Sequence, residues 1–230
     1  MRATEMTEAA DVLARRGWVV VRGPWDVPTH AQALRFAGRF GLPSSRDGGR
    51  PVWEVRPRPL GGTFSQRSGP VPLHTDAQYH PDPEDLVCLF AVRPAADGGH
   101  SLVLPADEAL TELRRRPDGV RSEAALRRPV WSWSTPAVFA AGRRAPSTAE
   151  ASPPVPVLAG GAVRWRPDNL VQVREAAATA FTETLAAARP AEVRLTPGDV
   201  LLVDNRRVLH GRTSFTDPRR LMFRVRLWSR

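Results

Sequence analysis

Short apolar segments, separated by turns that contain glycine or proline, are the feature of this sequence that most limits its fold. Residues 86–92 form a continuous apolar run, as in a β-strand that is buried on both faces. In residues 220–227, apolar residues alternate with three arginines and a methionine, so one face of this strand belongs in a core. The arginines on the other face would repel one another unless carboxylates or anions neutralise them.

The remaining patterns add further strands and several helices. Strands are expected at residues 18–21, 52–56, 100–104, 192–195 and 200–203. Helices are expected at residues 7–16, after the capping residue Thr29, and at 106–116 and 175–188. This order predicts an α+β protein that is mainly β with helical cover, in the form of a sandwich or barrel.

The length is consistent with a single domain over residues 1–230, which is large enough to bury a sizeable core. The stretch at about 131–160 is the least regular part and is rich in Pro, Ser, Ala and Gly. We interpret it as a possible lid or loop insertion.

The composition argues against several partners. The net charge of +9 comes entirely from arginine, because the sequence contains neither Lys nor Ile. Both absent residues need AT-rich codons, so a GC-rich genome explains the arginine excess better than binding to nucleic acid does. No apolar run approaches the roughly 20 residues of a membrane helix, and the first residues lack the apolar core of a secretion signal. With Cys88 as its one cysteine, the protein is expected in the cytoplasm, without a nucleic-acid or membrane partner.

Candidate metal ligands lie in two distant segments. His74 and Asp76 are two residues apart, so in an extended segment their side chains reach one point. His210 lies far downstream, and Asp204, Asn205 and Arg212 flank it with groups able to hold an imidazole. Two imidazoles and a carboxylate with open positions suit an Fe(II) oxygenase. Against this, a His-x-Asp pair often arises by chance, and a single His is more often structural.

Several motifs in one order extend this pattern over about residues 17–228. They are His74-Thr75-Asp76 with Tyr79-His80, Gly98 to Ser101, Pro197 to Leu201, Asp204 to Arg212, and Arg219 to Arg224. With these motifs the sequence resembles the Fe(II)/2-oxoglutarate oxygenases of the TauD/TfdA superfamily. It is most similar to the branch of clavaminate synthase and the asparagine and arginine hydroxylases. A departure is Asp76, where the nearest relatives usually have Glu.

The resemblance implies a distorted double-stranded β-helix, or jelly roll, with His74, Asp76 and His210 binding iron. It implies that Arg220 pairs with the distal carboxylate of 2-oxoglutarate, as a planar guanidinium can. Ser101 would assist at that carboxylate, and Arg224 would contact either 2-oxoglutarate or the substrate.

The resemblance also suggests residues that contact the substrate. Asp168 falls loosely where relatives place a carboxylate for the substrate amine, although a turn Asp after Pro167 is an equal alternative. The other candidates for the pocket wall are Gln78, Tyr79, His80 and Trp165.

The implied activity is hydroxylation, desaturation or cyclisation of a small polar substrate, with Fe(II) as cofactor and 2-oxoglutarate and O2 as cosubstrates. We expect an amino acid or an amino-acid-derived intermediate of natural-product biosynthesis, free or tethered to a carrier protein, and allow for a homo-oligomer. The carboxylate at position 76 disfavours halogenation, because halogenating relatives lack that ligand. Two alternatives remain open: a nucleic-acid or protein demethylase of the same superfamily, and a non-catalytic jelly roll that binds a small ligand.

Overall fold

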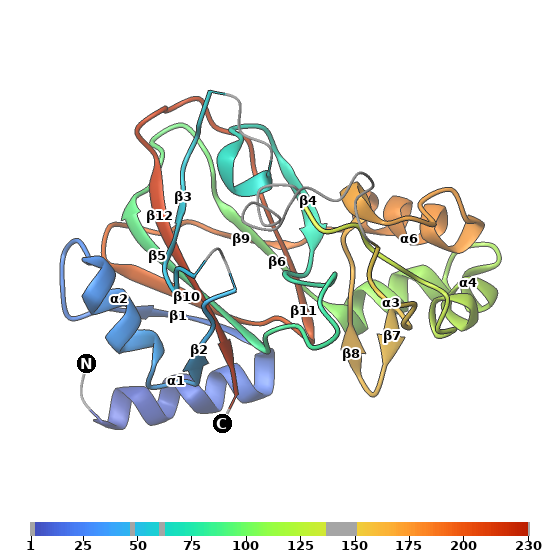
Figure 1. The fold of residues 1–230 in the computed structure, drawn as a ribbon, viewed down its shortest axis with the longest axis horizontal. Coiled ribbons are helices and arrows are strands. Elements are labelled where there is room, and N and C mark those ends of the chain that lie inside the picture. The colour runs from blue at the N-terminus through green and yellow to red at the C-terminus, as the bar shows by residue number, and fades with distance from the viewer. Residues whose placement is uncertain (1–2, 47–48, 60–62, 137–150, 230) are drawn as a thin grey trace.

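Two antiparallel β-sheets form the centre of the protein in the computed structural model, which describes residues 3–46, 49–59, 63–136 and 151–229 (Figure 1). In the larger sheet the strand order is β1-β10-β5-β12-β2, and β3 also pairs with β12. Its strands are β1 (Trp18–Arg22), β2 (Leu42–Pro43), β3 (Trp53–Val55), β5 (Leu86–Arg93), β10 (Asp199–Asp204) and β12 (Leu221–Trp228).

The smaller sheet has the order β4-β11-β6-β9. Its strands are β4 (Val71–His74), β6 (Ser101–Pro105), β9 (Ala191–Val193) and β11 (Val208–Arg212), and β7 (Leu158–Ala159) with β8 (Ala162–Val163) forms a separate hairpin. The two sheets pack face to face. Their shared apolar core contains Val87 and Leu201 from the larger sheet and Val103 and Val208 from the smaller one. A sandwich of this kind confirms the prediction of a mainly β protein.

Two N-terminal helices, α1 (Ala3–Arg16) and α2 (His30–Ala37), cover the outer face of the larger sheet. Phe36 of α2 packs on Phe90 of β5 with their ring centroids 5.9 Å apart. Thr29 caps α2 as expected, and Gln32 completes a capping box. The outward residues of β12, such as Val225, belong to this core, so the alternation read from residues 220–227 is confirmed.

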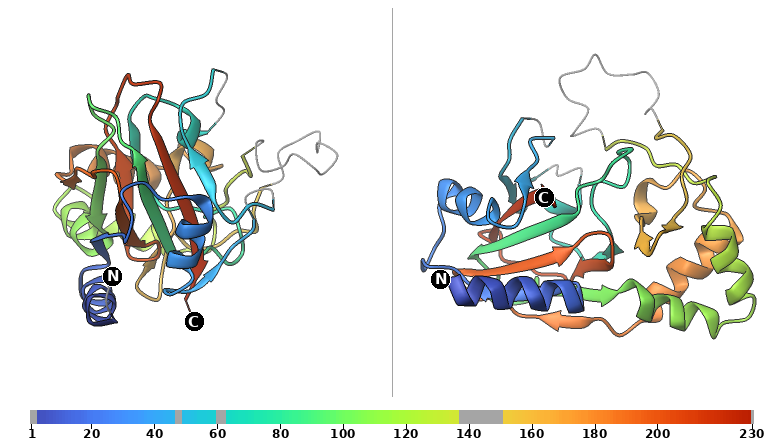
Figure 2. Two further views of the ribbon diagram at one scale, coloured as in Figure 1. Left: turned by 90° about the vertical axis from the view of Figure 1, so that its left-hand side faces the viewer. Right: turned by 90° about the horizontal axis from the view of Figure 1, so that it is seen from below.

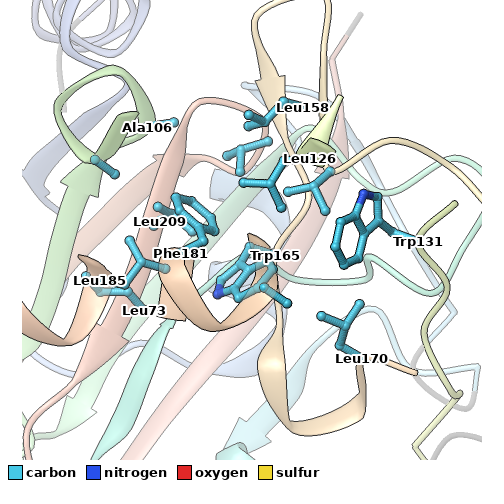
Figure 3. Close-up of a cluster of buried hydrophobic side chains, with 14 of the residues drawn as sticks. Leu73, Ala106, Leu126, Trp131, Leu158, Trp165, Leu170, Phe181, Leu185 and Leu209 are labelled. Atoms are coloured by element: carbon cyan, nitrogen blue, oxygen red, sulfur yellow. The ribbon is translucent and has the colours of Figure 1, made fainter. Parts of the chain in front are cut away.

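A second helical layer lies at the other end of the molecule, as Figures 1 and 2 show. It consists of α3 (Ala106–Arg114), α4 (Gly119–Leu126) and α6 (Ala176–Ala187), with short 3-10 turns elsewhere at Phe64–Gln66 and Pro167–Asn169. These helices and the β7-β8 hairpin enclose an apolar cluster in which Trp165 stacks edge-on against Phe181 (Figure 3). Leu73 and Leu209 reach this cluster from β4 and β11. The cluster therefore supports β4 and β11 on the face that points away from the larger sheet.

The segment at 131–160 lies partly outside the described residues, which omit 137–150. On its two sides Trp131 bridges to Val155 and Ser134 to Ala151. Both Trp131 and Trp133 are buried. The interpretation as a lid stays a prediction. Within the described ranges, no helix is both long and apolar enough to cross a membrane.

Candidate metal centre

The two candidate histidines face each other across neighbouring strands. His74 at the end of β4 is directly opposite His210 of β11, and their ring centroids are 4.5 Å apart. Successive side chains of a strand point to opposite faces. Because Leu73 and Leu209 point into the helical core, His74 and His210 point into the space between the sheets.

A glycine permits this close approach. The register between β11 and β4 shifts between His210 and Arg212, as in a β-bulge. A Cβ atom at Gly211 would lie 2.7 Å from the carbonyl oxygen of Val71, closer than carbon and oxygen tolerate. Any larger residue at this position would therefore push the two histidine-bearing strands apart.

Asp76 completes the cluster two residues after His74. One ligand atom from each of His74, Asp76 and His210 can be chosen so that all three lie within 4.8 Å of one another. His74 Nδ1 is 2.9 Å from the carbonyl oxygen of Pro72. When Nδ1 donates to that carbonyl, Nε2 keeps its lone pair and faces Asp76 Oδ1 at 3.7 Å. The donor set and its spacing fit a divalent transition metal such as Fe(II).

The backbone of Asp76 is fixed by a buried amide. Asp76 N–H donates to Asn205 Oδ1 at 2.7 Å, and Asn205 Nδ2 donates to the carbonyls of Asp76 at 3.0 Å and Glu84 at 2.8 Å. Asn205 thus takes the place of a strand partner where β4 has ended. The next residue, Ala77, has a φ of +60°, an unfavourable value for a residue with a Cβ. The sequence suggested that Asn205 would hold an imidazole, but it holds this loop instead.

The electrostatics favour the metal-binding protonation states. Burial raises the pKa of Asp76, but the charge of Arg224, helped by the neighbouring imidazoles of His74 and His210, outweighs it and holds this pKa well below its ordinary value. Arg224 Nη1 donates to Asp76 Oδ2 at 2.8 Å. Burial lowers the pKa of His210 to about 3; the charges of His74, Arg224 and Arg166 add to this effect and Asp76 opposes it. The site therefore presents a carboxylate and a neutral His210 at neutral pH.

These three residues line a cavity between the sheets, with an empty volume of about 860 Å³ that includes space open to solvent. Seven of the residues singled out from the sequence line it: His74, Asp76, Tyr79, Ser101, His210, Arg220 and Arg224. The other four, Gln78, His80, Asp168 and Trp165, are not among its lining residues. Gln78 donates to Asn169 Oδ1 at 3.0 Å, and Trp165 belongs to the helical core.

Arg220 is a buried cation whose guanidinium has few hydrogen-bond partners among the described residues. Its side chain lies beside the ring of Phe215, and its one hydrogen bond among the described residues is a long one of 3.4 Å from Nη2 to the carbonyl of Gly99. Nε and Nη1 are buried without a hydrogen-bond partner. Burial, with the charge of Arg212, lowers the pKa of Arg220 to about 9. A guanidinium left in this state is a ready receptor for a carboxylate.

Comparison with known proteins agrees with this geometry. A family model described as taurine catabolism dioxygenase TauD, TfdA family, matches residues 1–226. The chain belongs to the TauD/TfdA family. Comparison with curated protein sequences gives no match.

Solved structures share the fold of this TauD/TfdA member over almost its whole length. One is asparagine oxygenase in complex with Fe(II), 2S,3S-3-hydroxyasparagine and succinate, with a TM-score of 0.79 and 24% identity, covering 99% of this chain and 80% of that one. Another is the non-heme iron oxygenase OrfP in complex with Fe, succinate and (3S)-hydroxy-L-Arg, with a TM-score of 0.72 and 19% identity, covering 100% and 82%. The predicted jelly roll is confirmed.

Some residues of this TauD/TfdA site were missed from the sequence. Arg166, Arg212 and Phe64 line the cavity, although only Arg212 lay within a recognised motif.

The repulsion expected between the arginines along β12 is relieved by two ion pairs. Arg224 binds Asp76, and Arg226 Nη1 lies 3.4 Å from the buried Glu84. The two residues of each pair lie 148 and 142 positions apart in the sequence, so no local pattern could identify either carboxylate as the partner.

Proposed function

We propose that this protein is an Fe(II)/2-oxoglutarate-dependent oxygenase that hydroxylates an amino acid or an amino-acid-derived molecule. The observation that carries the proposal is one cavity in which His74, Asp76 and His210 converge and a buried, unsatisfied Arg220 also lies. Membership in the TauD/TfdA family supports it. So do the similar structures, which are complexes with iron, succinate and hydroxylated asparagine or arginine.

Each residue has a defined part in this proposal. His74, Asp76 and His210 would hold iron, and Arg220 would pair with the distal carboxylate of 2-oxoglutarate, with Ser101 beside it. Bound iron with 2-oxoglutarate and O2 supplies the oxidation of a C–H bond, with succinate and CO2 as coproducts. Phe64 and Tyr79 line the cavity, and their rings would exclude water from the reacting atoms. Arg224 holds one oxygen of Asp76, which fixes the orientation of the carboxylate.

A spectroscopic experiment tests the proposal. Anaerobic protein with Fe(II) and 2-oxoglutarate should show a weak charge-transfer band in the visible, and His210→Ala should remove it. Asn169→Ala, which removes an amide outside the iron cluster, should retain the band. If the band is absent from the unaltered protein, or survives in His210→Ala, the proposed iron site is wrong.

Succinate release measured over a panel of amino acids would then identify the substrate. Presenting each amino acid both free and as a carrier-protein thioester would show whether tethering is required. Product mass separates hydroxylation from desaturation or cyclisation. We place the enzyme in the cytoplasm, because the one cysteine, Cys88, is buried and unpaired.

A further inference from the structure

The cavity is lined by far more positive than negative charge. Among its described lining residues are Arg166, Arg212, Arg220, Arg224 and Arg226, whereas Asp76 is the one carboxylate. Bound Fe(II) would add two further positive charges, and 2-oxoglutarate would bring only two negative ones. An excess of positive charge in an enclosed site selects among ligands by their charge.

Four of these arginines already have a defined part. Arg224 pairs with Asp76 and Arg226 with Glu84. Arg212 Nη2 donates to the carbonyls of Arg67 at 2.6 Å and Gly69 at 2.8 Å, so it holds the loop before β4. Arg220 is the proposed receptor for 2-oxoglutarate. The fifth is Arg166, whose pairing with Asp168 leaves Nη1 without a hydrogen-bond partner among the described residues.

Hydrogen bonds of the preceding residue, Trp165, hold Arg166 next to the three candidate metal ligands. Thr75 N–H donates to the carbonyl of Trp165 at 2.7 Å, and Trp165 N–H donates to Thr75 Oγ1 at 2.9 Å. Thr75 stands between His74 and Asp76 in the sequence. Its two hydrogen bonds with Trp165 therefore bring the backbone of Arg166, the next residue, close to the candidate metal ligands. The guanidinium of Arg166 lies over the ring of Phe64, with its central carbon 4.4 Å from the ring centroid.

The guanidinium is oriented but not fully used. Its Nε and Nη2 donate to Asp168 at 2.8 and 3.3 Å, and the described residues provide no hydrogen-bond partner for Nη1. The Arg166 side chain is 6% exposed and lines the cavity, whereas that of Asp168 is 37% exposed and does not. Asp168 therefore holds one edge of the guanidinium from the solvent side.

We infer that the substrate carries a side-chain carboxylate which Arg166 receives, so that the enzyme prefers an acidic amino acid or acidic acyl group over those with neutral or cationic side chains. The inference rests on the proposed function and specifies its substrate class. A guanidinium or ammonium on the substrate side chain would meet Arg166, Arg224 and the iron, all of the same sign. A side-chain amide would accept a weaker hydrogen bond from Nη1 of Arg166 than a carboxylate would, because only the carboxylate makes a charge-assisted pair.

The experiment compares matched substrates on anaerobic protein that already shows the Fe(II)/2-oxoglutarate band, so loss of the proposed function is detected first and separately. L-Aspartate against L-asparagine, L-glutamate against L-glutamine, and L-arginine are each presented free and as carrier-protein thioesters. The readouts are perturbation of the band without O2 and, once O2 is admitted, the rate of succinate release. An acidic member should exceed its amide partner by at least tenfold in kcat/KM, and L-arginine should be inactive.

Variants assign the preference to Arg166. Arg166→Gln should abolish the advantage of the acid while leaving the band and the KM for 2-oxoglutarate unchanged. Arg166→Lys should restore part of it, and the exposed Arg174→Gln should change nothing. The inference is overturned if no acidic member exceeds its amide partner, or if Arg166→Gln raises the KM for 2-oxoglutarate instead.

Discussion

His210 lines the cavity as a neutral base, and its environment makes the stability of the protein depend on pH. In the unfolded chain a histidine takes up a proton near pH 6.5, whereas in the folded protein burial lowers the pKa of His210 to about 3. Between these two values the unfolded state binds more protons, so stability falls as the pH falls from 6.5 towards 3. Above pH 6.5 the group has no such effect.

From this we expect the metal-free protein to lose about 2 kcal/mol between pH 7 and pH 5 through His210 alone. Urea unfolding at the two pH values measures the loss. In His210→Gln the loss should be smaller by about that amount, whatever the stability of the variant at pH 7. Equal losses in both proteins would show that His210 is protonated in the folded state at pH 5.

Arg220 should show a conflict between stability and binding. A buried guanidinium with unsatisfied Nε and Nη1 costs desolvation energy that its long bond to Gly99 does not recover. Arg220→Met should therefore stabilise the metal-free protein by about 1–2 kcal/mol in urea unfolding. The same change should raise the KM for 2-oxoglutarate at least tenfold, because a charge-assisted pair is lost. A destabilised variant with an unchanged KM would mean that Arg220 has a structural role instead.

The loop after β4 depends on the segment after β10. Asn205 supplies both a donor and an acceptor to the backbone of Asp76 and ties it to Glu84, while Ala77 beside it occupies an unfavourable φ. Backbone strain of this kind persists only where the surroundings enforce it. Without the amide the loop should relax, and the carboxylate of Asp76 should lose its fixed position relative to the two histidines.

Asn205→Ala should accordingly weaken Fe(II) binding by about 10–100-fold, the usual effect of removing a group that orients a metal ligand. Anaerobic Fe(II) titration measures the affinity, and circular dichroism confirms that the sheets remain intact. Asn169→Ala is the matched control, since this amide bonds Gln78 and the carbonyl of Ser134 but not the Asp76 loop. Similar affinities in the two variants would refute the role of Asn205.

The sandwich and the convergence of His74, Asp76 and His210 could be anticipated from the chain. Apolar runs such as residues 86–92 show which segments are buried, and the short spacing of His74 and Asp76 predicts that their side chains reach one point. The alternation in β12 also predicted that its arginines need carboxylate or anionic partners. Those partners could not be named, because Glu84 stands in a loop whose prolines and acids look like solvent-exposed sequence.

The position of Arg166 is a second feature that could not be predicted from the sequence. In Arg166-Pro167-Asp168 it reads as a surface turn, and only the pairing of Thr75 with Trp165 brings it to the cavity. Hydrogen bonds across 90 residues leave no local pattern in the sequence. For side chains that depend on such contacts, among them Asn205, the role cannot be predicted without the fold.

Across the molecule, iron and 2-oxoglutarate should act as a link between the two sheets. His74 and His210 belong to the smaller sheet, whereas Arg220 directly precedes β12 of the larger one. A ligand that binds only the folded state stabilises it by about 2.7 kcal/mol at a hundred times its Kd. For a chain of this size each kcal/mol raises Tm by about 2–4 °C.

We therefore expect anaerobic Fe(II) with 2-oxoglutarate at saturation to raise Tm by about 5–10 °C, and a chelator to reverse the shift. 2-Oxoglutarate should add little without metal, because the iron provides half of its site. Succinate, which has the distal carboxylate but no keto acid to bind iron, should give a smaller shift. In His210→Ala the metal-dependent part should disappear while any direct effect of Arg220 on the carboxylate remains. A shift by 2-oxoglutarate that is equally large without metal and in His210→Ala would place the keto acid away from the three ligands, and the two sheets would then have no common ligand.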